Sequence, residues 1–186
     1  MRIIGGKWRG TALAGVGMGD PAAHLRPTSD KVRESLFNVL EHGPYPTLKG
    51  IRVLDLFAGT GALGFEALSR GAETVHFIDN GPRSLALLRE NTGRLSAAAQ
   101  VRVTRRNATR PGANAGPGYE LVFLDPPYGK ALGEAAMAAA QSGGWLAPGA
   151  LIVWEEGGPI TPPPRLTLRD ERRYGDTWIR LLEAEF

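Results

Sequence analysis

The sequence has no cysteine and only three histidines, and both shortages restrict its chemistry. Without cysteine the chain has no disulfide framework, no thiolate nucleophile and no cysteine-bearing zinc or iron–sulfur site. The histidines are scattered without ligand spacing, so we expect no metal centre. The chain also lacks an apolar run of the roughly 18 residues that span a bilayer, and glycine and charge interrupt its N-terminus too early for a signal peptide. We therefore expect a cytoplasmic protein without a membrane partner.

Positive charge is scarce outside the first part of the chain. The net charge is +3 over 186 residues. Through Leu54 there are eight Lys and Arg against four Asp and Glu, a balance of +4, whereas the remainder has fourteen against fifteen, a balance of −1. The length suits one hydrophobic core. We expect a single domain over 1–186, with a basic N-terminal extension (1–50) and a catalytic core (51–186), and a monomer, since no segment signals dimerisation.

Apolar runs alternate with helical patterns through most of the chain. Runs that are apolar on both faces predict a parallel sheet covered by helices on both sides, an α/β fold. Two further segments flank Gly175-Asp176 and predict a C-terminal antiparallel hairpin. Residues 10–25 have no apolar periodicity and are expected to form a mobile loop. The expected helices are 30–41, a stretch that follows the glycine turn at 58–64 and ends near 70–71, 82–98 and 132–142. The expected strands are 51–57, 74–79, 101–104, 120–125, 150–155, 166–174 and 177–184.

A glycine-rich segment between the first strand and its helix predicts a nucleotide site. Gly59, Gly61 and Gly64 have the G-x-G-x-x-G spacing, which lets the backbone turn sharply and approach a nucleotide closely. A tight turn without a ligand has the same spacing. Asp79 favours the nucleotide, because a carboxylate at the end of the next strand can accept both ribose hydroxyl hydrogens; the alternative is a turn residue before Asn80.

Asp55 separates two classes of nucleotide. A carboxylate just before the glycine segment would repel the pyrophosphate of a dinucleotide. It would attract a cofactor that carries a cationic sulfonium and an α-amino group. The sequence therefore favours S-adenosyl-L-methionine over NAD.

Asp125-Pro126-Pro127-Tyr128 follows a core strand, at the sheet edge where ligands bind in open α/β folds. This motif fits methylation of an exocyclic base amine, whose lone pair is delocalised into the ring. If Asp125 and a backbone carbonyl accept the amine hydrogens, the lone pair can turn towards a methyl donor. The prolines fix φ and bring no N–H, and Tyr128 offers a flat face for stacking, typically worth about 1–3 kcal/mol. The alternative is a proline turn with a half-buried tyrosine.

With these residues in view, the chain resembles the bacterial 16S rRNA guanine-N2 methyltransferase family of the RsmD type, a class I methyltransferase with a Rossmann-like sheet. The likeness covers nearly the whole chain and is carried by residues 1–10, 26–28, 32–38, 54–64, 123–128 and 144–146. The N-terminal segments discriminate, because Asp-Pro-Pro-Tyr also occurs in adenine-N6 DNA methyltransferases and in enzymes acting on other rRNA.

The resemblance implies roles for the matched positions. Asp55, Gly59 and Gly61 would line the methionine side of the cofactor, and Asp79 would take the ribose. Residues 125–128 would hold the guanine amine, and residues 26–28 would fold over the cofactor. The cofactor candidates are Asp55, Ala58, Gly59, Gly61, Asp79, Asn80, Asn107, Ala108, Arg26 and Thr28, and the catalytic candidates are Asp125, Pro126, Pro127 and Tyr128.

Asn107-Ala108 departs from the family pattern. Such enzymes usually place an acidic residue before this alanine, where it accepts from the adenine amino group. The carbonyl oxygen of asparagine can still accept, so weaker cofactor binding is expected. Asn107 is equally well interpreted as a plain turn residue.

Basic residues interleaved with an aromatic near the N-terminus are candidates for RNA contacts. They are Arg2, Lys7, Trp8, Arg9 and Arg33. The alternative is ordinary solubilising charge. The expected partner is 16S rRNA within an assembled or partly assembled small ribosomal subunit, because unpaired bases are the ones readily splayed out.

Three other functions remain open on the sequence. Within enzymes, the target is alternatively an adenine N6 or another rRNA guanine. The chain is alternatively a non-catalytic RNA-binding module with a vestigial cofactor fold, against which the intact residues 125–128 argue. A nicotinamide oxidoreductase is the third option, and Asp55 argues against it.

Overall fold

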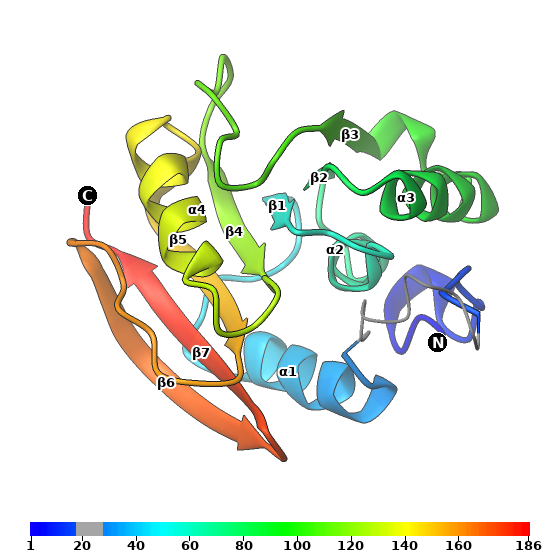
Figure 1. Cartoon of the computed structure of the whole chain (residues 1–186). Coiled ribbons are helices and arrows are strands. Elements are labelled where there is room, and N and C mark those ends of the chain that lie inside the picture. The colour runs from blue at the N-terminus through cyan, green and yellow to red at the C-terminus, as the bar shows by residue number, and fades with distance from the viewer. Residues whose placement is uncertain (18–27) are drawn as a thin grey trace.

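A seven-stranded sheet forms the centre of the molecule (Figure 1). The computed structural model describes residues 1–17 and 28–186. The strands are β1 (Arg52–Leu56), β2 (Thr74–Asp79), β3 (Val101–Arg105), β4 (Tyr119–Leu124), β5 (Leu146–Glu156), β6 (Leu166–Tyr174) and β7 (Thr177–Ala184). They lie in the order β3-β2-β1-β4-β5-β7-β6. The first five strands in this order, β3, β2, β1, β4 and β5, are parallel to one another, and β7 is antiparallel to both β5 and β6. This arrangement confirms the predicted mostly parallel sheet with a C-terminal antiparallel hairpin.

The helices match the predicted pattern with small differences at their ends. They are α1 (Asp30–His42), α2 (Ala62–Ser69), α3 (Pro82–Arg94) and α4 (Leu132–Ser142), with short 3-10 helices at Gly6–Trp8 and Ala98–Gln100. Helix α3 ends before the predicted residue 98 because Ser96 adopts a left-handed φ of 51°, which an α-helix cannot include. No helix within 1–17 and 28–186 is long and apolar enough to cross a membrane.

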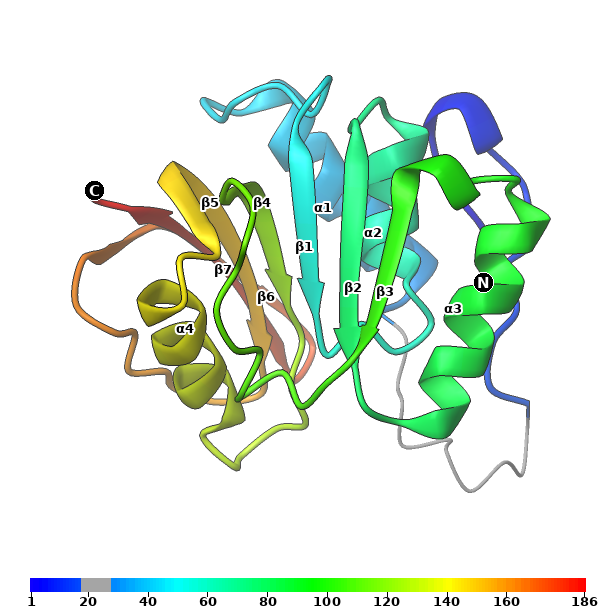
Figure 2. The same ribbon diagram turned by 90° about the horizontal axis from the view of Figure 1, so that it is seen from above.

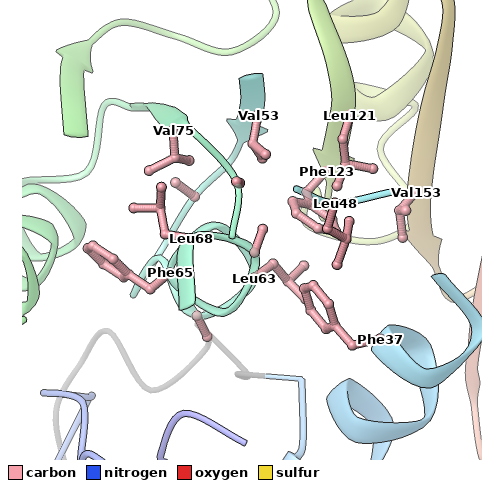
Figure 3. Close-up of a cluster of buried hydrophobic side chains, with 14 of the residues drawn as sticks. Phe37, Leu48, Val53, Leu63, Phe65, Leu68, Val75, Leu121, Phe123 and Val153 are labelled. Carbon is pink, nitrogen blue, oxygen red and sulfur yellow. The ribbon is translucent and has the colours of Figure 1, made fainter. Parts of the chain in front are cut away.

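Helices cover both faces of the sheet, as predicted. Helices α1 and α2 pack on one face, where Phe37 of α1 contacts Phe123 of β4 (Figure 3) and Phe65 of α2 contacts Phe77 of β2. Helix α4 packs on the opposite face (Figure 1), against a second cluster that contains Leu54. Successive strand residues point to opposite faces, so both must be apolar. This requirement explains the uninterrupted apolar runs in the sequence.

The strand order reverses between β1 and β4, and this reversal creates the crevice in which ligands bind in open α/β sheets. The arrowheads of β1, β2 and β4 point to one edge of the sheet (Figure 2). Asp55 lies near the end of β1, Asp79 ends β2, and Asp125 follows β4. The topology therefore brings the three predicted aspartates to one edge.

The first residues of the chain form a fixed part of the fold. Ile3 and Leu13 are buried in the core beside α2, and Arg2 forms an antiparallel bridge with Ala12. The prediction of a mobile loop is therefore wrong for residues 10–17, because apolar side chains without helical periodicity dock onto a core built by other elements. Residues 18–25 of that predicted loop lie outside the described residues.

Glu66 of α2 anchors this N-terminal segment through hydrogen bonds to its backbone. Its side chain is fully buried, and its two carboxylate oxygens accept the backbone N–H groups of Ile4 and Gly5, each at 2.8 Å. The Arg70 guanidinium donates to the same carboxylate at 2.8 Å. Helix α2 therefore begins within the glycine segment, and its later residues Glu66 and Ser69 bind the backbone of the basic N-terminus.

Candidate active site

The glycine segment between β1 and α2 has the geometry that its spacing predicts. Gly61 has a φ of 80°, and a Cβ there would lie 2.6 Å from the side chains of Leu88 and Phe65. Gly59 has a φ of 55° and open space, since the nearest atom to a Cβ would be the Phe57 oxygen at 3.9 Å. Gly61 therefore serves close packing, and Gly59 leaves room for a ligand to approach the backbone.

Phe57 begins this turn with a φ of 58°, a conformation that is rare for an aromatic residue. Such strained residues cluster at ligand sites, where the surrounding structure holds them in place.

Asp79 ties the glycine segment to the turn after β2. One of its carboxylate oxygens accepts the Gly59 N–H at 2.9 Å, and the other accepts the Gly81 N–H at 2.8 Å. Each carboxylate oxygen has a second lone pair, and the side chain is partly exposed. The carboxylate is consequently held in a fixed orientation beside the open space at Gly59. The neighbouring Asn80 is exposed.

Asp55 lies beneath the first turn of α2. It is nearly buried and accepts the Gly64 N–H at 3.1 Å. Burial raises the pKa of Asp55 well above its ordinary value, the Gly64 N–H opposes this rise, and the Asp79 carboxylate adds to it. A negative charge at this position is therefore stabilised further by a cation in the crevice.

The Asp125-Pro126-Pro127-Tyr128 turn leaves β4 at the crevice. Asp125 is partly exposed and Pro127 is exposed, whereas Pro126 is buried. The Tyr128 side chain is 42% exposed, and a Cβ on Gly157 would lie 2.7 Å from the tyrosine ring. The ring therefore rests on glycine backbone, and part of it stays open for stacking.

Glu155 and Glu156, at the end of β5, are acidic members of the site that the sequence analysis missed. Leu124 of β4 pairs with Trp154 of β5, so the next residues along these parallel strands, Asp125 and Glu155, are neighbours. The signal in the sequence is an acidic pair at the end of an apolar strand, but its meaning depends on β5 lying beside β4.

Glu155 is nearly buried. It accepts the Tyr128 hydroxyl at 2.9 Å and the Thr28 hydroxyl at 2.8 Å. Burial raises the pKa of Glu155, and these two hydrogen bonds oppose the rise.

Together these carboxylates make the crevice strongly acidic. Burial raises the pKa of Asp125 well above its ordinary value, and the carboxylates of Glu155, Asp55 and Glu156 raise it further. Burial also raises the pKa of Tyr128, whose hydroxyl therefore stays protonated and donates to Glu155. An ordinary anion would be repelled here, whereas a cationic or hydrogen-donating ligand would relieve the repulsion.

The remaining cofactor candidates differ in burial and in their hydrogen-bond partners. Ala58 and Ala108 are buried. The side-chain oxygen of Asn107 accepts hydrogen bonds from both the backbone N–H and the hydroxyl of Thr109, each at 2.9 Å. These bonds are typical of a turn residue, the second of the two interpretations given for Asn107. Thr28 is buried against Glu155, and Arg26 lies outside the described residues.

Four of the five RNA candidates lie at the surface. Arg2, Lys7 and Arg9 are exposed, and Trp8 is partly exposed beneath the Lys7 ammonium, which lies 4.1 Å from the ring centroid. The prediction is wrong for Arg33, whose side chain is fully buried.

The Arg33 guanidinium instead makes hydrogen bonds within the protein. It donates to the carbonyl oxygen of Thr28 at 2.9 Å, to the Asp30 carboxylate at 2.8 Å and to the carbonyl oxygen of Arg2. It lies on the inner face of α1, where a buried arginine can persist only with such partners.

The chain is similar to known methyltransferases over almost its whole length. Residues 1–183 match the family described as Conserved hypothetical protein 95. Ribosomal RNA small subunit methyltransferase D of Escherichia coli strain K12 is 39% identical and covers 100% of this chain and 90% of its own length. The enzyme of the same name from Haemophilus influenzae is 36% identical over 98% of this chain and 93% of its own. The solved structure of yhhF, a candidate methyltransferase from Escherichia coli, aligns with a TM-score of 0.82 and 36% identity over 100% of this chain and 98% of that one.

Proposed function

Because the chain belongs to the Conserved hypothetical protein 95 family of RsmD-type methyltransferases, we propose that it methylates the exocyclic N2 amine of a guanine in 16S rRNA, with S-adenosyl-L-methionine as the methyl donor. The observation that carries this proposal is the partly exposed Asp125 beside the open ring of Tyr128, in an acidic crevice next to the glycine segment.

The crevice fits the proposed methyl donor. When bound, S-adenosyl-L-methionine supplies a methyl group on a positively charged sulfur. The space at Gly59 lets a ligand lie against the backbone, and Asp79 holds a carboxylate beside that space for hydroxyl hydrogens. Asp55 contributes negative charge from beneath the helix turn and does not need to touch the ligand to attract a cation.

Asp125 acts on the base amine. Its carboxylate accepts one amine hydrogen, a backbone carbonyl of the proline turn accepts the other, and the nitrogen lone pair then points towards the methyl donor. The raised pKa of Asp125 makes it a better acceptor for the proton that the amine loses. Holding the amine in line contributes several kcal/mol to the lowering of the barrier, of the order of the effective-molarity effect for two oriented reactants.

Tyr128 and the N-terminal segment bind the RNA. The open part of the tyrosine ring stacks on the extruded guanine. Arg2, Lys7 and Arg9 contact phosphates, and this sequence-independent attraction contributes affinity that falls with salt.

Methyl transfer to isolated small subunits tests the proposal. Small subunits from a strain that lacks the enzyme are incubated with the protein and tritiated S-adenosyl-L-methionine, and the labelled nucleotide is mapped and hydrolysed to the base. We expect N2-methylguanine at one position. The matched control uses subunits from a strain that has the enzyme, which should accept no label because their target is already methylated. Label on adenine N6, or no label at all, would overturn the proposal.

A further inference from the structure

The Glu155 carboxylate links two distant parts of the chain to the catalytic turn. Tyr128 follows β4, Thr28 precedes α1, and both hydroxyls donate to Glu155. The side chain is only 7% exposed, so these bonds are shielded from solvent and are stronger than surface contacts. The Arg33 guanidinium completes the connection by donating to the Thr28 carbonyl.

We propose that Glu155 is a positioning residue for base methylation: it fixes the ring of Tyr128 for stacking, and Thr28, held by Arg33, fixes Glu155 in turn. This inference rests on the proposed function.

The contacts of Tyr128 show why such a residue is required. The ring is 42% exposed and rests on the backbone of Gly157, which offers a flat support but no directional bond to the ring. Direction comes from the hydroxyl, which donates to Glu155 and lies 3.1 Å from the Thr177 hydroxyl. An exposed aromatic side chain without such an anchor would sample several rotamers, and the base would be stacked correctly only part of the time.

Loss of Glu155 would also affect methyl transfer by a second route, through Asp125, and the experiment must distinguish it from the effect on Tyr128. Glu155 raises the pKa of Asp125 through its negative charge, so its removal would act on the proton acceptor directly. An effect through the tyrosine ring disappears when the tyrosine hydroxyl is absent, whereas an effect through Asp125 persists. A double-mutant cycle distinguishes the two.

The test measures kcat/KM for small subunits in the full-length wild type, Glu155→Gln, Tyr128→Phe and the double variant. Each single variant should lose roughly 10- to 100-fold, as expected for one hydrogen bond to a charged acceptor. The double variant should lose no more than the greater single loss. The affinity for S-adenosyl-L-methionine, measured by calorimetry, should change less than about threefold, because Asp79 is a carboxylate that contacts the glycine segment, whereas Glu155 and Tyr128 hydrogen-bond to each other.

Thr28→Val provides an independent second cycle with Tyr128→Phe, in case Glu155→Gln does not fold. We expect the same non-additive result with a smaller single loss. Glu183→Gln serves as the matched control, because Glu183 is an exposed carboxylate that pairs with Arg169 on the C-terminal hairpin; it should keep wild-type kcat/KM.

The possible failures are distinguishable. If the wild type transfers no methyl group to the subunits, the proposed function itself is overturned. If the wild type is active but the losses multiply in both cycles, or if Glu155→Gln keeps full activity, only the positioning role is overturned.

Discussion

Replacing Glu66 by alanine should strongly destabilise the protein and release its N-terminal segment. The substitution removes an acceptor for the backbone N–H groups of Ile4 and Gly5 and for the Arg70 guanidinium. Removing one partner of a buried ion pair costs about 3–5 kcal/mol, and unsatisfied donors cost about 1–3 kcal/mol each. Because these costs overlap and Arg70 retains an ion pair with Glu41, we expect the free energy of unfolding to fall by about 4 kcal/mol.

Urea denaturation followed by circular dichroism measures this loss. The melting temperature should fall by roughly 10 °C, given about 2–4 °C per kcal/mol for a chain of this size. Glu66→Gln keeps one carbonyl acceptor and should lose about half as much free energy. Trypsin should also cleave after Lys7 and Arg9 faster in Glu66→Ala, because the opened segment exposes its backbone.

The matched control is Glu90→Ala, which removes an exposed helical carboxylate paired with Arg94. It should change the unfolding free energy by less than about 0.5 kcal/mol. If Glu66→Ala lost less than about 1 kcal/mol, the reasoning that Glu66 anchors the N-terminal segment would be refuted.

Asp125→Asn should reduce methyl transfer by roughly 100-fold or more, the typical effect of losing a general base, while calorimetry shows an unchanged affinity for S-adenosyl-L-methionine within a few-fold; full turnover would contradict the assigned role. His76 of β2 is buried and hydrogen-bonds with Tyr119 and Thr104. Burial lowers its pKa from 6.5 to about 4, so only the unfolded chain gains a proton as the pH falls from about 6.5 towards 4, and stability is lost over that range. The unfolding free energy should therefore drop by about 2 kcal/mol between pH 7 and pH 5 on account of this residue, and an equal drop in His76→Gln would show that other groups cause it. Reversing Arg2, Lys7 and Arg9 to Glu should weaken subunit binding and flatten its salt dependence; equal binding by the variant at low salt would mean that these residues only solubilise the protein.

Much of the fold follows from local patterns in the sequence. Apolar runs that leave no polar face require a sheet covered on both sides, and the hairpin around Gly175-Asp176 follows from alternation and a turn signal. Several predicted element ends differ from those in the structure. Helix α3 ends early at the left-handed Ser96, and β5 begins at Leu146, earlier than the predicted residue 150, because the pairing of Tyr119 with Leu146 extends that strand.

The tertiary structure decided the accessibility of charged residues. Arg33 looked like its basic neighbours in the sequence, yet its position on the inner face of α1 buries it and directs its guanidinium to Thr28. Residues 10–17 have no apolar periodicity and therefore resemble a loop in the sequence, but the side chain of Leu13 is buried in a core that α2 and the sheet already form.

By itself, the sequence singled out the groups that we propose for the chemistry, because glycines, prolines and carboxylates at short fixed spacings act through local geometry. Asp55 lies near the end of β1, Asp79 ends β2 and Asp125 follows β4, and these parallel strands end at one edge of the sheet. Only the tertiary structure decided which further groups join them. Glu155 lies far from Asp125 and Thr28 in the chain. It neighbours Asp125 because β5 pairs with β4, and it accepts from Thr28, which precedes α1. Such neighbours depend on long-range packing that no local pattern records.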